Sequence, residues 1–358
     1  MTNRYLHQLS QCKSLGDMEI KTSERMFRRQ LQPNKAYKFI YCGIEKAGST
    51  FWRRLLQYVQ LGKIQTPYRI RPELANSYYV DLSKTTLLEV LGLLKSFTKF
   101  IFVRNPYTRL LSGFIDKLYS PNPYYWNKIG IPATRLAREI TNTCGHDVSF
   151  KEFVEYIIHS NNNPKIKRDV HFIPAYQLCL PCHIQYDFIG KIESFENDVM
   201  FILEKLNLTQ YIPVLQNFKN QSVVDAIYDV SHTFIEFRKE ASKCLSFEES
   251  LKRTWRKLQL RGIIADEINL PFSYTEAENI TEEKLLSTFI KSFKQSQKFD
   301  LRSQKRKHLI YAYSTISLQT LEKLAKVFII DFKIFDYNMY PASIFQNKNI
   351  SEHSVAQW

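Results

Sequence analysis

The sequence has 358 residues and lacks any long apolar run, because no 18 consecutive apolar residues occur in it. A helix needs about 20 such residues to cross a bilayer, so no membrane-spanning segment is visible. Residues 87–94 are too few for this purpose and contain Glu89. The N-terminus is polar and lacks the apolar segment of a secretory signal. We therefore expect any membrane attachment to depend on a segment absent from this chain.

The sequence also lacks the signatures of nucleic-acid-binding modules and of zinc sites. It contains no zinc-finger spacing, no aromatic strand of the RNA-recognition type and no heptad-bearing basic region. Cys179-Leu180-Pro181-Cys182 has no second cysteine pair to complete a zinc site, and His183 is adjacent rather than at ligand spacing. We expect neither a nucleic-acid partner nor a bound metal.

Six cysteines are present, namely Cys12, Cys42, Cys144, Cys179, Cys182 and Cys244. They are compatible with disulfides formed in an oxidising lumen and equally with buried thiols. A redox motif normally opens a helix after a strand, whereas the 179–182 pair precedes a predicted strand. We therefore favour disulfides from this pair to Cys144 or Cys244. Four glycosylation sequons, at Asn207, Asn220, Asn279 and Asn349, weakly favour a secretory route.

Acidic residues are few relative to basic ones. The 50 Lys and Arg residues outnumber the 35 Asp and Glu residues and leave a formal charge of +15. Such an excess favours a polyanionic partner, which is a nucleic acid, an anionic membrane surface or an acidic polysaccharide. Basic residues are dense in 252–261 and 291–307, although solvated helix faces account for part of this density. Composition thus indicates an acidic partner without naming it.

Strand-like segments alternate with helical ones along the chain. We predict strands at 38–43, 97–104 and 184–190, and helices at 51–61, around 110–118, after the capping box of Ser149 and Glu152, at 196–206 and at 318–328. This alternation predicts an α/β fold with a P-loop-like, mainly parallel sheet flanked by helices. We expect a stem or N-terminal helix at 1–35, one composite domain at 36–345 with a helical insertion at about 213–310, and a tail at 346–358.

The segment from Gly43 to Trp52 (G-I-E-K-A-G-S-T-F-W) predicts a phosphate-binding loop between a strand and a helix. Small residues let backbone N–H groups face one anion, and the helix N-terminus adds its positive dipole end. Ser49 and Thr50 supply hydroxyl groups at the same place. The lysine that follows the second Gly of a nucleoside triphosphatase loop is missing, and Lys46 lies inside the loop instead. A tight strand-to-helix turn without a ligand is the alternative.

A second element follows the next predicted strand, in the run V-R-N-P-Y-T-R-L-L-S from Val103 to Ser112. Arg104 stands at the carboxyl end of that strand, where open α/β sheets bind ligands. Its guanidinium suits bidentate contact with phosphate oxygens, and Ser112 in the next helix supplies a hydroxyl. On its own Arg104 is better explained as a surface ion-pair partner. Together with the first loop it indicates a clamp on a second phosphate.

The ordered motifs resemble those of the Golgi carbohydrate sulfotransferases of the chondroitin and dermatan type. Residues 45–52 are similar to the family's loop for the 5′-phosphosulfate of 3′-phosphoadenosine 5′-phosphosulfate (PAPS), and residues 103–112 to its 3′-phosphate motif. A third block spans 169–190, and a weaker fourth block spans 331–337. The resemblance covers about 37–210 and 318–340. The first three motifs in this order are specific, whereas any one alone is not.

The resemblance implies a sulfotransferase domain that moves a sulfuryl group from PAPS to a hydroxyl of an acidic glycan in the Golgi lumen, without a metal. It implies that the donor is held by Lys46, Ala47, Gly48, Ser49, Thr50, Arg104 and Ser112. Lys46 suits the oxygen that bridges phosphate and sulfate, where leaving-group charge develops. The acceptor hydroxyl needs a base with a pKa near neutrality, which favours His171 over Asp169 and then Glu45.

Three features of the sequence depart from the family pattern. Glu45 places an acid beside an anionic donor, and Phe172 stands where Trp is common. Residues 213–310 have no recognised counterpart, so the acceptor is not carried over from the family. Two alternatives therefore stay open: a P-loop kinase, which would need the missing lysine and magnesium, and an inactive protein of this fold that binds a glycan or nucleotide.

Overall fold

The computed structural model describes residues 1–16, 23–62, 66–70, 74–75, 81–140, 142–215 and 217–346. The predicted tail and the sequon at Asn349 lie almost wholly outside these residues. Two compact units share the chain. Unit 1 comprises Met1–Arg109, Arg168–Lys219 and Phe328–Met339, and unit 2 comprises Leu110–Lys167, Asn220–Val327 and the residues from Tyr340 onward.

Unit 1 contains a four-stranded sheet in the order β1-β2-β3-β4. Its strands are β1 (Leu31–Asn34), β2 (Phe39–Cys42), β3 (Thr98–Val103) and β4 (Phe188–Lys191). β2, β3 and β4 run parallel to one another, and β1 pairs antiparallel with β2. The predicted fold class is thus confirmed: a mainly parallel sheet flanked by helices. Parallel pairing brings the carboxyl ends of β2 and β3 to the same edge of the sheet.

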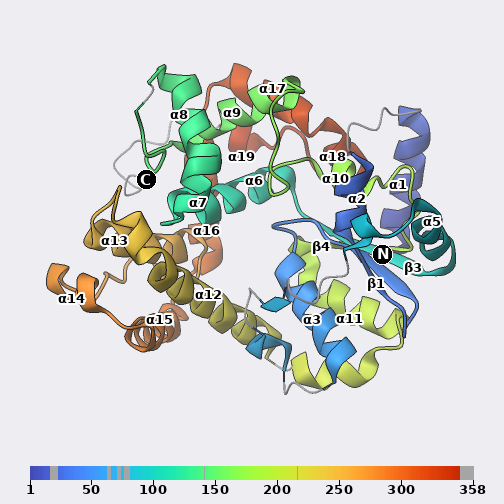
Figure 1. The fold of residues 1–358 in the computed structure, drawn as a ribbon, viewed down its shortest axis with the longest axis horizontal. Coiled ribbons are helices and arrows are strands. Elements are labelled where there is room, and N and C mark those ends of the chain that lie inside the picture. Colours follow the sequence, from blue (N-terminus) through green and yellow to red (C-terminus); the bar gives the residue numbers. More distant parts are fainter. Residues whose placement is uncertain are drawn as a thin grey trace. The chain divides into compact units, whose positions relative to one another are not determined.

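Helices cover both faces of this sheet, because alternate residues of each strand point to opposite sides. Phe39 and Tyr41 of β2 pack with α3 (Ser49–Leu61) and α11 (Phe195–Lys205). Ile40 and Cys42 pack on the other side with the group α2 (Glu24–Gln30), α5 (Leu87–Ser96), α10 (Ala175–Cys179) and α18 (Ile329–Ile334). Figure 1 shows α3 and α11 together beside the strands. Both strand faces are therefore buried, as the apolar segments predicted.

Most predicted elements are confirmed near their expected bounds. The predicted strands correspond to β2, β3 and β4, and the predicted helices correspond to α3, α6 (Pro106–Phe114), α9 (Phe150–Asn162), α11 and α17 (Leu318–Val327). The capping box precedes α9, where Glu152 N–H donates to Ser149 Oγ at 3.2 Å. β4 begins four residues later than predicted, because residues 184–187 form bends and irregular structure in place of a strand. The edge strand β1 was missed because its sequence, L-Q-P-N, lacks apolar alternation.

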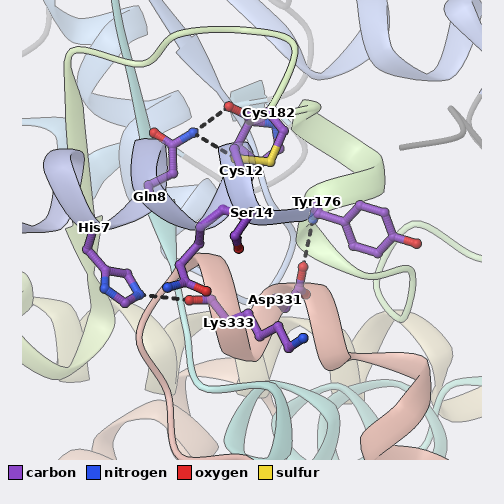
Figure 2. The surroundings of a disulfide bond; sticks show 10 residues. His7, Gln8, Cys12, Ser14, Tyr176, Cys182, Asp331 and Lys333 are labelled. Carbon is purple, nitrogen blue, oxygen red and sulfur yellow. Dashed lines mark hydrogen bonds between the residues drawn. A yellow bond between two sulfur atoms is a disulfide. The ribbon is translucent and has the colours of Figure 1, made fainter. Parts of the chain in front are cut away.

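The N-terminal segment contains a helix, α1 (Thr2–Leu15), that docks on unit 1. A disulfide joins Cys12 to Cys182, and Gln8 Nε2 donates to the Pro181 carbonyl at 2.6 Å. His7 Nε2 lies 2.8 Å from the Lys333 carbonyl of α18. Figure 2 shows these contacts around the disulfide. α1 is therefore packed against the sheet unit by covalent and polar contacts.

All six cysteines form disulfides, and the predicted partners of the 179–182 pair were wrong. Cys179 bonds to Cys42, and Cys182 to Cys12. Cys144 and Cys244 bond to each other within unit 2. Cys179 ends α10 and faces the same core as Cys42 at the end of β2. Partners separated by 137 and 170 residues meet only through packing of the sheet, which sequence spacing does not reveal.

Unit 2 is helical in its described residues. Its first part contains the π-helical turns η3 (Ile115–Tyr119) and η4 (Trp126–Gly130), with α7 (Pro123–Tyr125), α8 (Ile131–Arg138) and α9. Its later helices are α12 (Phe218–Ala241), α13 (Phe247–Leu260), α14 (Tyr274–Asn279), α15 (Glu282–Ser296), α16 (Leu301–Ser314), α17 and α19 (Ala342–Phe345). α12, α13 and α15 share a core that includes Phe234, Trp255 and Phe289. The described residues of the range 213–310 are thus mainly helical, and their being an insertion in the domain stays a prediction.

Short 3-10 helices complete the described structure: η1 (Pro67–Arg69), η2 (Leu82–Lys84), η5 (Ile192–Ser194) and η6 (Thr209–Leu215). Among the helices of the described residues, none has both the length and the apolarity needed to cross a membrane.

Candidate active site

The loop between β2 and α3 has the backbone of an anion-binding turn. Lys46 has φ 66° and Gly48 has φ 80°, so two of its residues are left-handed. A Cβ on Gly48 would come within 2.8 Å of the Phe195 ring, so a glycine is required there both for conformation and for space. Such turns direct neighbouring N–H groups to one side, next to the N-terminus of the 13-residue helix α3. This geometry agrees with the predicted phosphate-binding loop.

The Glu45 carboxylate is paired with Arg53 inside the protein, which explains how the loop tolerates an acidic residue. Its carboxylate forms an ion pair with Arg53, and Ser49 Oγ donates to it at 2.8 Å. Burial raises the pKa of Glu45, but the Arg53 guanidinium and His171 outweigh burial and hold that pKa at about 2. A carboxylate with so low a pKa is a poor proton acceptor near neutrality. The low pKa therefore disfavours Glu45, the third candidate for the base.

The two predicted hydroxyl donors of the loop differ in their surroundings. Ser49 is buried, and its hydroxyl proton is directed to Glu45 rather than into the loop. Thr50 is exposed on the first turn of α3. The hydroxyl of Thr50 is therefore better placed than that of Ser49 to reach a bound anion, whereas Ser49 supports the loop through Glu45.

Arg104 connects the two predicted phosphate-binding elements. It follows β3 directly, and its Nη1 donates to the Lys46 carbonyl at 3.3 Å. Its Nε donates to Thr108 Oγ1 at 3.1 Å, which fixes the guanidinium over the start of α6. Lys46 and Arg104 thus meet at the carboxyl edge of neighbouring parallel strands. Ser112 belongs to unit 2, and its part in the clamp stays a prediction.

His171 and Asp169 form a hydrogen-bonded pair in the turn before α10. Asp169 Oδ1 lies 2.6 Å from His171 Nδ1 and accepts the backbone N–H of His171 at 2.9 Å. The Asp169 side chain is only 3% exposed, and that of His171 is 16% exposed. A carboxylate only accepts, so Nδ1 carries the proton and the lone pair of the neutral ring lies on Nε2. Asp169 therefore orients the histidine and is poorly placed to act as the base itself.

Arg109 is the site residue that sequence reasoning missed. Its Nε donates to the Glu45 carbonyl at 2.9 Å, and its Nη1 donates to the Ile173 carbonyl at 2.7 Å. Its Nη2 donates to the Val170 carbonyl at 3.3 Å. The planar Arg109 guanidinium therefore fixes the backbone at Glu45, next to Lys46, relative to the backbone at Val170, next to His171. Its place in the motif beside Arg104 was the one signal in the sequence.

A buried carboxyl, Asp331, supports the same region from the fourth motif block. It accepts the backbone N–H groups of Ala175 at 2.7 Å and Tyr176 at 2.8 Å, and thereby caps α10 (Figure 2). Burial raises the pKa of Asp331 to about 6, against those hydrogen bonds and the attraction of Arg109. Burial likewise lowers the pKa of Arg109 to about 10, although Asp331 and Glu45 oppose that change. The fourth block is thus structural.

Unit 1 therefore brings together the loop, Arg104, Arg109 and the Asp169–His171 pair, from three separate parts of the sequence. The sequence profile described as the sulfotransferase family matches residues 29–258 of the chain, which include all of them. No solved structure matches the chain.

Several curated proteins are similar to this chain. Carbohydrate sulfotransferase 9 of Homo sapiens is 32% identical over 248 residues, which are 67% of this chain and 52% of that protein. Carbohydrate sulfotransferase 11 of Mus musculus is 30% identical over 226 residues, or 58% of this chain and 63% of that protein. Carbohydrate sulfotransferase 8 of Mus musculus is 34% identical over 179 residues, or 48% of this chain and 42% of that protein.

The matches thus cover about half of the length of these relatives. The family profile covers well over half of this chain and spans the loop, Arg104 and His171. The resemblance inferred from the ordered motifs is thereby confirmed, and this chain belongs to the sulfotransferase family, together with the carbohydrate sulfotransferases.

Proposed function

We propose that the protein transfers a sulfuryl group from PAPS to a hydroxyl of an acidic glycan such as chondroitin or dermatan. The observation that carries the proposal is the contact of Arg104 with the Lys46 carbonyl, which joins the two phosphate-binding elements. One nucleotide with phosphates at both ends needs two cationic sites on one surface. Family membership and the curated relatives support the same activity.

Each residue has a role that follows from its position. Backbone N–H groups of residues 48 and 49 and the Thr50 hydroxyl would hold the 5′-phosphosulfate, whereas the Ala47 N–H closes the turn by donating to the Ile44 carbonyl at 3.1 Å. Arg104 would hold the 3′-phosphate, together with Ser112 as predicted from the sequence. Lys46 would stabilise the charge that develops on the departing phosphate oxygen. These groups supply the positive charge without a metal.

The acid–base step falls to the Asp169–His171 pair. As the acceptor oxygen forms its bond to sulfur and the sulfur–phosphate oxygen bond breaks, the hydroxyl proton passes to His171 Nε2. Adenosine 3′,5′-bisphosphate leaves. Asp169 stabilises the imidazolium that results, because its carboxylate accepts a hydrogen bond from Nδ1–H, with Oδ1 2.6 Å from Nδ1. The pair therefore resembles the base and orienting carboxylate of other enzymes.

The acceptor class and the compartment rest on other observations. The formal charge of +15 would attract a polyanion through a field that salt weakens. Three disulfides fit an oxidising lumen. Asn207, Asn220 and Asn279 of the sequons are all exposed. These features support a Golgi-lumen enzyme that acts on an acidic glycan.

The test is radiolabelled sulfate transfer from PAPS to chondroitin, dermatan, heparan and desulfated glycans, run beside calorimetric binding of adenosine 3′,5′-bisphosphate. We expect transfer to at least one glycan, a loss of about 10²-fold or more with Lys46→Ala, and a similar loss with His171→Ala. Nucleotide binding should change far less in both variants. Unchanged turnover of Lys46→Ala would remove it from the mechanism.

The same experiment separates the two alternatives. Nucleotide binding without transfer to any acceptor would favour an inactive binding protein. Magnesium-dependent use of ATP in place of PAPS would favour a P-loop kinase, although the lysine that such an enzyme needs after the second Gly is replaced by Ser49.

A further inference from the structure

Two π-helical turns follow each other closely in unit 2. η3 (Ile115–Tyr119) and η4 (Trp126–Gly130) lie on either side of α7. π-helical turns are rare, and they occur frequently at functional sites. Each of these turns carries one lysine, Lys117 in η3 and Lys128 in η4. The extra residue in each turn shifts the directions of the side chains from those of a continuous α-helix.

The shifted lysines converge on two neighbouring tyrosines. Lys117 Nζ lies 4.9 Å from the centre of the Tyr125 ring. Lys128 Nζ lies 5.4 Å from the Tyr124 ring centre and 5.7 Å from that of Tyr125. Tyr124 is 58% exposed, and its ring meets Tyr125 edge to face at 5.0 Å. We call these four residues the Tyr124 patch.

Rigid contacts support the Tyr124 patch from beneath. The indole Nε1 of buried Trp126 donates to the Leu118 carbonyl at 2.9 Å and so ties η4 to η3. A Cβ on Gly130 would lie 2.1 Å from the Gly145 carbonyl oxygen, so the two backbones are in direct contact. Gly145 adjoins the Cys144–Cys244 disulfide. A surface held in this way loses little conformational entropy when a ligand binds.

The patch contains two lysines and adjoins the ion pair of Asp116 with Lys257. Asp116 lies 3.3 Å from Lys117 Nζ and 2.8 Å from Nζ of the buried Lys257, so two lysines share one carboxylate. Lys128 adds a third cation beside the exposed ring. An aromatic face binds the C–H face of a sugar ring, and ammonium groups bind carboxylates or sulfates. The combination suits a sugar polymer that carries regular negative charges.

We infer that the Tyr124 patch binds the acidic glycan acceptor, with a sugar ring on Tyr124 and an acidic group at Lys128. This inference rests on the proposed function, in which the acceptor is a glycan. It adds a binding surface in unit 2 to the donor site in unit 1. The patch would determine affinity for uronic-acid-containing chains and leave the chemical step unchanged.

Calorimetry with unsulfated chondroitin, in the presence of adenosine 3′,5′-bisphosphate, tests the inference without requiring turnover. We expect Tyr124→Ala and Lys128→Gln each to weaken chondroitin binding about 10-fold, as loss of one charged or stacking contact does. Nucleotide affinity should stay unchanged. In transfer assays the same variants should raise KM for chondroitin while kcat stays the same. Carboxyl-reduced chondroitin should bind the intact chain more weakly than chondroitin.

Matched controls are available in the same unit. Tyr340 is 52% exposed and Lys243 is exposed, so Tyr340→Ala and Lys243→Gln remove similar groups elsewhere. Equal chondroitin binding by the patch variants and these controls would overturn the inference, even if sulfate transfer is demonstrated. Tighter binding of a single-stranded oligonucleotide than of chondroitin would also overturn it. If no acceptor is sulfated but the patch variants alone lose chondroitin binding, the proposed function fails and the patch stands.

Discussion

Replacing Arg109 by lysine tests whether one buried guanidinium sets the geometry of the site. The side chain is 2% exposed and donates to the carbonyls of Glu45, Val170 and Ile173. Lysine keeps the positive charge but has no planar fork, and its single ammonium cannot match three carbonyls in these fixed directions. Arg109→Lys therefore separates charge from geometry.

The expected magnitude follows from those three contacts. A hydrogen bond from a charged donor contributes about 1.5–3 kcal/mol, and a buried carbonyl left without a donor costs about 1–3 kcal/mol. If lysine keeps one contact, two hydrogen bonds from a charged donor are lost, so the free energy of unfolding should fall by about 3–6 kcal/mol. Freed from Arg109, the backbone beside Lys46 and His171 is expected to shift. A displacement of about 1 Å reduces turnover by about 10²-fold.

The assay compares urea unfolding, nucleotide binding and sulfate transfer for Arg109→Lys and for the control Arg54→Lys. Arg54 is also 2% exposed and lies in unit 1 on α3, so it reports the general cost of altering a buried arginine. We expect kcat to fall only in Arg109→Lys, at temperatures where both variants are folded. A folded Arg109→Lys variant with the kcat of the intact chain would refute the proposed positioning role.

Two further predictions concern the loop and the buried carboxyl of unit 1. Gly48→Ala should destabilise the protein by about 1–3 kcal/mol and abolish tight nucleotide binding, because φ is 80° and the new methyl would lie 2.8 Å from Phe195. Thermal unfolding measures the stability and calorimetry measures the binding. Unaltered nucleotide binding would contradict the prediction. Burial raises the pKa of Asp331 to about 6, so the native state holds a proton that the unfolded state releases. The free energy of unfolding should therefore fall by roughly 3 kcal/mol as pH rises from about 4 to about 6, and equal slopes for Asp331→Asn and the intact chain in urea titrations would disprove this.

Local patterns predicted the sheet and the turn between β2 and α3 well. Apolar runs identified β2 and β3, and the capping box of Ser149 and Glu152 marked the start of α9. These features depend on neighbours in the sequence, since turn conformation and helix capping are set within a few residues. Short-range chemistry also singled out Lys46 and Arg104, because each follows a predicted strand. The structure then showed that the two strands are parallel neighbours.

Sequence patterns failed where segments that are distant in the sequence determine the structure. The pairing of Cys42 with Cys179 depends on which face of β2 meets α10, and β1 is identified only by its pairing with β2. The low pKa of Glu45 depends on Arg53 and His171 together. None of these partners is marked by spacing, because burial and pairing arise only when the chain is packed.

The amino-acid sequence by itself determined that this protein is built from strand–loop–helix elements, for which we propose a doubly phosphorylated nucleotide as the ligand. Tertiary structure alone decided how those elements meet: Arg109 joins the Lys46 loop to the His171 turn, and Asp169 orients the histidine. The physical reason is the distance along the sequence over which each interaction acts. Backbone conformation responds to adjacent residues, whereas hydrogen bonds between carbonyls and a guanidinium more than 60 positions away exist only after the core has formed.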